Sequence, residues 1–170
     1  SYGPKVWKEA TGSDRYRRAL YTFRFRSVLY PPLQNFDTPN GDFACVKRVR
    51  SNTPLQALTT LNEPLFLETA RALARRTLVE AGPDDAARLR HAFRLCVARE
   101  PTQREIDVLH GLLTAEARRF AEGQGDPLAL LGAKPEQPPR LPAAVDVPTA
   151  AAWTAVARVL LNLDETITRE

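Results

Sequence analysis

The feature that most constrains the fold is the stretch from Arg50 to Ala74, in which a polar corner precedes two segments of helical spacing. Thr53 is a favoured N-cap residue, and Pro54 suits the first helical position because no N–H is needed there. Gln56, at the third position, can bond back to the cap residue, which completes a capping box. The sequence therefore predicts a helix that begins at residue 54.

Helical spacing continues on both sides of a second proline. Leu55, Leu58 and Leu61 are spaced to lie on one face of the first helix. Asn62-Glu63-Pro64 interrupts this helix, because the residue before a proline is disfavoured in helical conformation. The spacing then resumes at Leu65, Phe66, Thr69, Ala70, Leu73 and Leu78. We expect two helices that meet at a bend at residues 62–64.

Periodicity and capping signals predict three further helices. One carries an apolar stripe formed by Ala86, Leu89, Ala92, Phe93, Cys96 and Val97. A second capping box, Thr102 with Glu105, begins the next, whose apolar positions are Ile106, Leu109, Leu112, Leu113 and Phe120. We expect Thr149 to cap a final helix that buries Trp153, Val156, Ala157, Leu160, Leu161 and Leu163.

Two regions give little sign of regular structure. Residues 121–149 contain six prolines and three glycines, which indicates a long surface loop without helix or strand. Residues 15–26 fit both a helix and a strand, and we favour a helix. The sequence at 37–42 is typical of a turn, and a short strand or extended piece can follow over 43–50.

The sequence therefore predicts an all-α fold of about five helices in an irregular bundle, with a loop-rich basic N-terminal third. We expect a single domain over 1–170, divided into an irregular basic segment at 1–50, a helical core at 51–121, a Pro/Gly-rich loop at 122–148 and a C-terminal helix at 149–170. No apolar run approaches the roughly 18 residues of a membrane span. The chain has no methionine, which indicates a processed chain or a fragment of a larger one.

Charge is unevenly distributed along the chain. Ten of the 24 Lys and Arg residues but only four of the 20 acidic residues lie in 1–50, which gives this segment a net charge of +6 and the remainder −2. Aromatic residues are interleaved with these charges at Tyr16, Tyr21, Phe23 and Phe25. Nucleic acid can bind such a segment, but charge alone is a weak signal. We favour pairing of these arginines with carboxylates and carbonyls of the same protein or of a neighbouring domain.

The sequence offers no recognisable cofactor or metal site. Cys45 and Cys96 are the only cysteines, and neither a CysXXCys nor a CysXXCysHis motif occurs, so we expect neither a zinc knuckle nor a c-type haem. A disulfide in an oxidising compartment would stabilise the chain by roughly 4 kcal/mol. A buried free thiol at Cys96 is the alternative, and the sequence leaves both open.

Polar residues that can bind a ligand gather around the capped corner. The candidate binding residues are Asp37, Arg48, Arg50, Asn52, Gln56, Asn62 and Asp164. If they come together, they would line a notch able to bind hydroxyl-rich ligands or a partner's backbone. The structural interpretation, which we favour, is that such residues cap helices and that Arg50 pairs with Asp37 or Asp164.

Catalytic patterns are weak. The one carboxylate pairing that suggests glycoside hydrolysis is Asp37 with Asp164 or Glu165, and the sequence does not give its separation. His91 and His110 lack partners at metal-ligand spacing, and neither a GlyXSerXGly motif nor a Gly-rich phosphate loop is present. We assign no catalytic residue.

Two strings carry a resemblance to a known family, SNTPLQAL at 51–58 and LNLDE at 161–165. With Pro31-Pro32 and Phe36-Asp37, they make the chain resemble the planctomycete PSD-one domain. This domain of unknown function forms the C-terminal part of secreted proteins that commonly also carry a cytochrome c-like haem domain. The resemblance implies an extracytoplasmic location, periplasmic or secreted, and upstream domains of the same protein as partners.

We therefore expect a non-catalytic interaction or docking module in a secreted multidomain haem-associated protein, possible roles being polysaccharide breakdown and electron transfer. Its partner would be an upstream domain or a polysaccharide. The alternative is enzymatic: Asp37, Arg50, Asn52 and Gln56 would contribute to a hydrolase or oxidoreductase site that an upstream domain completes.

Overall fold

The computed structural model describes residues 8, 10–25 and 28–168, and among these the protein is all-α, as predicted. Helices account for 59% of the structure and no strand occurs in the described part. Five of the α-helices there have seven residues or more, in agreement with the predicted number.

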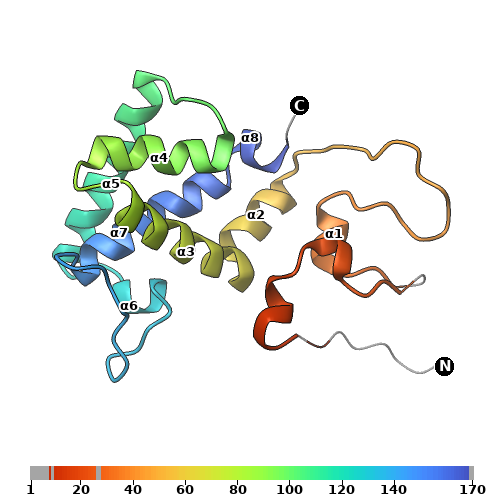
Figure 1. Cartoon of the computed structure of the whole chain (residues 1–170), viewed down its shortest axis with the longest axis horizontal. Helices are drawn as coiled ribbons and strands as arrows, with labels where there is room; N and C mark the ends of the chain where they lie inside the picture. Colours follow the sequence, from red (N-terminus) through yellow and green to blue (C-terminus); the bar gives the residue numbers. More distant parts are fainter. Residues whose placement is uncertain (1–7, 9, 26–27, 169–170) are drawn as a thin grey trace. The chain divides into compact units, whose positions relative to one another are not determined.

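The helices fall into long and short elements (Figure 1). The long α-helices are α2 (Pro54–Asn62), α3 (Pro64–Glu80), α4 (Asp85–Val97), α5 (Gln103–Ala121) and α7 (Val147–Leu161). The short α-helices are α1 (Pro31–Asn35), α6 (Pro127–Leu130) and α8 (Asp164–Ile167). Two 3-10 helices, η1 (Gly12–Tyr16) and η2 (Ala19–Tyr21), precede them.

Contacts divide the chain into two compact units, residues 1–56 and residues 57–170. The first unit contains η1, η2, α1 and the first turn of α2. The second contains the rest of α2 and all later helices.

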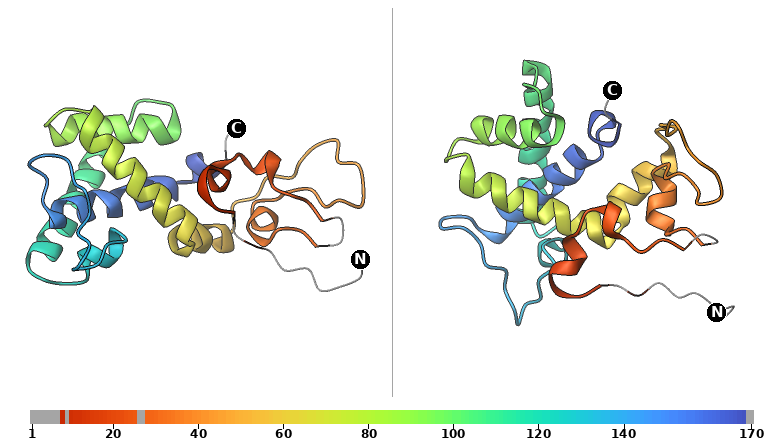
Figure 2. Two further views of the ribbon diagram at one scale, coloured as in Figure 1. Left: turned by 60° about the horizontal axis from the view of Figure 1, so that its bottom comes forward. Right: turned by 45° about the vertical axis from the view of Figure 1, so that its right-hand side comes forward.

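Helix α7 lies at the centre of the second unit, where it contacts α3, α4, α5, α6 and α8 (Figures 1 and 2). A helix that is apolar nearly all the way round must be covered on all sides. Its buried residues are Ala150, Ala151, Ala152, Trp153, Thr154, Val156, Ala157 and Leu160. Four of the six predicted buried positions are confirmed, whereas Leu161 and Leu163 are only partly buried.

Amphipathic helices surround α7. Each turns a stripe of apolar residues toward the core and arginines or acids toward solvent, as 3–4 spacing predicts. The core positions of these helices are Ala70, Ala74, Leu78, Leu89, Ala92, Phe93, Cys96, Ile106, Leu109, Leu113 and Phe120. The predicted stripes of α4 and α5 are largely confirmed.

Side-chain caps fix where these helices begin. Thr102 accepts a hydrogen bond from the Glu105 N–H and its own N–H donates to the Glu105 carboxylate, which confirms the second capping box. The prediction for α7 was wrong: the helix begins at Val147, and its cap is Asp146, whose Oδ1 accepts from the Thr149 N–H at 2.9 Å. Asp is a better N-cap than Thr, and Pro148 is tolerated in the first turn, so capping preference favours Asp146 over Thr149.

The stretch predicted to lack regular structure, residues 122–148, contains the whole of α6 and the first two residues of α7. Asp126 caps α6 by accepting from the Ala129 N–H at 2.9 Å, and a proline occupies its first turn. Leu130, Leu131 and Val145 pack against the core. Pro127 is compatible with this helix because proline is tolerated in a first turn, and Gly132, with a φ of +68°, follows its end.

The face of α2 that carries Leu55 and Leu58 is exposed. Leu55 and Leu58 are each 56% exposed, whereas the polar Gln56 and Thr60 are buried at 1% and 3%. Helical spacing shows that the leucines share a face, but it does not show which face is buried.

Apart from the first turn of α2, the described part of the first unit contains only short helices. The predicted helix at 15–26 is replaced by η1 and η2 up to residue 21, and residue 26 lies outside the described part. Residues 43–50 form bends and irregular chain, and no strand. Gln56 is the one buried residue that the structure describes in this unit.

Candidate functional site

The capped corner at the start of α2 forms as predicted. The Gln56 N–H donates to Thr53 Oγ1 at 3.3 Å, and the Thr53 N–H donates to Gln56 Oε1 at 2.9 Å. This reciprocal pair satisfies two donors that the first turn of a helix would otherwise leave without partners.

Asp37 is tied to this corner. It has a positive φ of 57°, just after α1, and its carboxylate accepts the Ser51 N–H and the Ser51 hydroxyl, each at 2.8 Å. Gln56 Nε2 lies 3.3 Å from Asp37 Oδ2 and 3.2 Å from Ser51 Oγ. Hydrogen bonds from Ser51 are the main reason that the pKa of Asp37 is lowered. We call Asp37, Ser51 and Gln56 the corner network.

Three further candidates lie in the loop next to this network. Arg48 donates to the Phe36 carbonyl, and its positive charge contributes to the lowered pKa of Asp37. Arg50 and Asn52 are exposed. The contacts of the first unit therefore bring Asp37 and Gln56 together, with Arg48 nearby, and the roles of both central residues are structural.

The last two candidates have local roles in the second unit. Asn62 Nδ2 donates to the Leu58 carbonyl at 2.9 Å, at the end of α2. Asp164 is exposed at the start of α8, where its Oδ1 accepts the Thr168 hydroxyl at 2.8 Å. Both residues bond within their own turn of helix.

An ion-pair cluster that we did not predict centres on Arg99. Its guanidinium lies 2.7 Å from Glu105 and 2.6 Å from Glu165, and stacks over the Phe93 ring at 4.8 Å from the centroid. These hydrogen bonds lower the pKa of Glu105 to about 2 and also lower that of Glu165. The cluster joins the start of α5 to α8, and it occupies Glu165, one of the carboxylates considered for hydrolysis.

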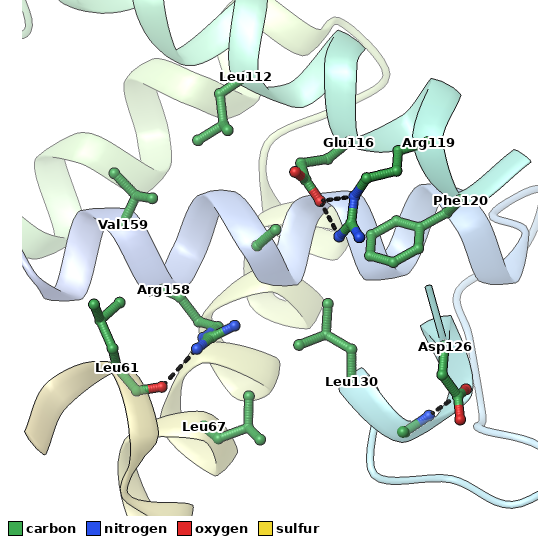
Figure 3. Close-up of a pocket in the computed structure, with 12 residues that line it drawn as sticks. Leu61, Leu67, Leu112, Glu116, Arg119, Phe120, Asp126, Leu130, Arg158 and Val159 are labelled. Carbon is green, nitrogen blue, oxygen red and sulfur yellow. Dashed lines mark hydrogen bonds and ion pairs between the residues drawn. The ribbon is translucent and has the colours of Figure 1, made fainter. Parts of the chain in front are cut away.

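A pocket of about 530 Å³ opens in the second unit, between the end of α2 and helices α3, α5, α6 and α7 (Figure 3). Most of its lining is apolar. The lining residues are Leu61, Leu67, Leu112, Glu116, Arg119, Phe120, Asp126, Ala129, Leu130, Ala155, Arg158 and Val159.

The charged groups of the pocket differ in how they are paired. Arg119 lies 2.6 Å from Glu116 and stacks over the Phe120 ring at 4.4 Å, and Asp126 caps α6. Arg158 Nη2 donates to the Leu61 carbonyl at 2.6 Å. The Nε of Arg158 is buried and has no hydrogen-bond partner within the described part of the chain.

Helix α6, one wall of the pocket, is held by an arginine on α3. Arg71 Nε donates to the Leu130 carbonyl at 2.7 Å, and Nη2 donates to the Ala129 carbonyl at 3.1 Å. Burial lowers the pKa of Arg71. Gly132 allows this approach, because its φ is +68° and a Cβ there would lie 2.5 Å from Arg71 Nη1.

Sequence reasoning missed this pocket. Its polar groups come from helices far apart in sequence, and we read those helices only as core. The available signal was Arg158, the one charged residue in α7, whose other residues are mostly apolar. A lone arginine in such a helix needs a polar partner or an opening to solvent.

Apolar residues are exposed in the first unit. Those with exposures from 64 to 102% are Tyr16, Leu20, Tyr21, Phe23, Phe43, Val46 and Val49. We call these the exposed apolar set. The basic residues of the same segment are also exposed, among them Arg15, Arg17, Arg18, Arg24, Lys47, Arg48 and Arg50.

Both cysteines are free thiols. Cys45 is exposed, and burial of Cys96 raises its pKa to about 11. Within the described residues, no group of three or more His, Cys, Asp and Glu side chains is arranged to hold a metal ion. Nor does any helix there have the length and apolar character needed to cross a membrane.

Comparison with protein families identifies a match over much of the chain. A family model named PSD1, protein of unknown function (DUF1553), matches residues 2–113, which is more than half of the chain. Searches of curated proteins and of solved structures found no match. The matched residues include the capped corner, helices α2 to α4 and most of α5. The chain therefore belongs to the PSD1 family of proteins of unknown function (DUF1553).

Proposed function

We propose that this chain is a non-catalytic docking module and that its first unit supplies the docking surface. The observation that carries this proposal is the exposed apolar set, together with the lack of any buried apolar residue in the described part of that unit. Burial of apolar surface provides roughly 25 cal/mol per Å², so a segment without a core gains little stability from its own packing. A partner that covers the set would supply that stability.

The composition of the surface also fits an interface. Tyrosine, phenylalanine and arginine are enriched where proteins bind each other, because they combine apolar area with a polar group. The exposed apolar set contains Tyr16, Tyr21, Phe23 and Phe43, and exposed arginines lie between them in sequence. This chemistry fits a partner surface with apolar pockets and acidic residues around them.

The partner we propose is an upstream domain of the same polypeptide. Support for this choice comes from the resemblance to the planctomycete PSD-one domain, which implies a secreted protein with a cytochrome c-like domain before this one. On this proposal the chain is extracytoplasmic, holds no cofactor itself, and serves a protein engaged in polysaccharide breakdown or electron transfer.

The enzymatic alternative has less support. A general acid needs a raised pKa, whereas that of Asp37 is lowered. The Asp37 carboxylate and the Gln56 amide both bond within the corner network, so neither is available to a substrate without breaking it. We therefore assign Asp37 and Gln56 the role of holding the corner.

Titration calorimetry with the separately expressed upstream part of the protein tests the docking proposal. The test variant combines Leu20→Ser, Phe23→Ser and Val46→Ser, which changes three members of the exposed apolar set. The control combines Val79→Ser and Val108→Ser, two residues of the second unit that are 61% and 65% exposed. We expect the test variant to bind at least tenfold more weakly and the control to bind as the unchanged chain does.

Two results would contradict the proposal. If the test variant binds the upstream part with unchanged affinity, the exposed apolar set is not the docking surface. If the chain instead sediments with an insoluble polysaccharide and the test variant does not, the partner is a polymer and not an upstream domain.

A further inference from the structure

Arg158 is the one charged residue in α7, and its neighbours in the helix are mostly buried and apolar. Its Nη2 donates to the Leu61 carbonyl, whereas its buried Nε has no hydrogen-bond partner among the residues that the structure describes. A buried donor on a charged group that lacks an acceptor is energetically unfavourable, because it has lost its hydrogen bonds to water without replacing them. An acceptor at this position would remove that penalty.

The carboxylates that line the same pocket already have partners. Glu116 pairs with Arg119, and Asp126 accepts from the first turn of α6. Figure 3 shows Arg158 beside Leu61 and Leu67, with Asp126 beyond Leu130. The missing acceptor would therefore come from a molecule that enters the pocket.

The pocket selects the chemistry of that molecule. Its volume of about 530 Å³ lies in the range of sites for small ligands, roughly 300–1,000 Å³. Six of its lining residues are large and apolar: Leu61, Leu67, Leu112, Phe120, Leu130 and Val159. Such a lining favours a ligand whose body is apolar.

The charged residues of the pocket indicate which head group the ligand would carry. A guanidinium binds a carboxylate through paired N–H donors, and one unpaired guanidinium matches one negative charge. Glu116 and Asp126 would oppose a dianion such as a phosphate monoester. We propose that the pocket binds a small monocarboxylate with an apolar body, whose carboxylate bonds to Arg158 and whose body lies against Leu130 and Phe120.

Binding of octanoate to the whole chain tests this proposal, with octanamide as a neutral analogue of the same shape. We expect calorimetry to show saturable binding of octanoate and at least tenfold weaker binding of octanamide. Arg158→Met should weaken the binding of octanoate at least tenfold and leave the binding of octanamide unchanged. The control is Arg118→Met, because Arg118 is on α5, is exposed and does not line the pocket.

A second variant keeps the test decisive if Arg158→Met does not fold. Ala129 is exposed and lines the pocket from α6, so Ala129→Trp fills space while Arg158 remains. This variant should weaken the binding of octanoate and of octanamide by the same factor. Equal affinity of the unchanged chain for octanoate and octanamide would overturn the role of Arg158. If millimolar octanoate does not saturate the chain, the proposed binding site is overturned, because water alone would then satisfy the Nε of Arg158.

Discussion

Replacement of Leu160 by alanine tests whether α7 organises the second unit. Leu160 is 0% exposed, and the helix that carries it contacts five others. Loss of a fully buried leucine side chain removes its transfer free energy and leaves a cavity that its neighbours fill only in part. We therefore expect Leu160→Ala to lower the free energy of unfolding by about 2–5 kcal/mol.

The adjacent residue provides a matched control. Val159 lies on the same helix but is 38% exposed, so Val159→Ala should lower the free energy of unfolding by about 1 kcal/mol or less. Thermal melting, monitored by far-ultraviolet circular dichroism, measures the stability of both variants. The signal reports mainly on the second unit, because most of the helical residues belong to it. For a unit of this size we expect roughly 4 °C per kcal/mol, hence a midpoint about 8–20 °C lower for Leu160→Ala.

The comparison of the two variants can refute the reasoning. If Leu160→Ala and Val159→Ala lower the midpoint equally, burial along α7 is not what determines stability. If neither changes the midpoint, the second unit does not depend on α7 for its core.

Three smaller perturbations test local parts of the structure. Thr53→Ala should destabilise the chain by about 1 kcal/mol through loss of the cap of α2, and an unchanged melting curve would contradict the capping box. Asp146→Ala should destabilise α7 by about 1 kcal/mol and Thr149→Ala by less, because the N–H of Thr149 remains, and equal effects in denaturant titrations would contradict the assigned cap. The pKa of Glu105 in the folded chain, about 2, is below its ordinary value of 4.5, so its stabilisation is present above pH 4.5 and is lost as the pH falls toward 2. Arg99→Met should flatten this acid dependence in melting experiments, and an unchanged pH profile would show that the ion pair does not cause it.

Local signals predicted the parts of the fold that depend on nearby residues. The two capping boxes formed as expected, because a threonine and a glutamine or glutamate three residues apart need no other part of the chain. The stripes of α4 and α5 were also predicted, since 3–4 spacing on a long helix identifies residues that share a face. The start of α7 was predicted wrongly, because Asp146 and Thr149 can each cap a helix and Thr149 was the residue expected to do so.

Contacts between distant residues could not be predicted from pattern. Arg99 and Glu165 are 66 residues apart, and no spacing rule relates them. In α2, Gln56 and Thr60 are buried and Leu55 and Leu58 are exposed, because helical spacing shows which residues share a face but not which face is covered. The pocket likewise depends on where α6 packs against α7, and the proline-rich stretch that connects the two helices does not predict this.

The candidate site shows the same division. The residue types around Asp37 and Gln56 suggested a polar corner, and their contact confirms that these two lie together. Hydrogen-bonding capacity alone did not reveal that the corner uses that capacity itself, through Ser51 and the cap of α2. The sequence therefore identified polar residues that use their hydrogen bonds locally, and for Asn62 and Asp164 it did not predict proximity to the corner.

Hydrogen exchange tests the docking proposal most directly. Amide exchange would be measured for residues 12–25 and 28–50 in the isolated chain and in the protein that contains the upstream domain, with the amides of α7 as an internal reference. The docking proposal predicts that exchange in these residues slows when the upstream domain is present, while exchange in α7 stays the same, because the partner covers the exposed apolar set. Equal rates in these residues in both samples would contradict it.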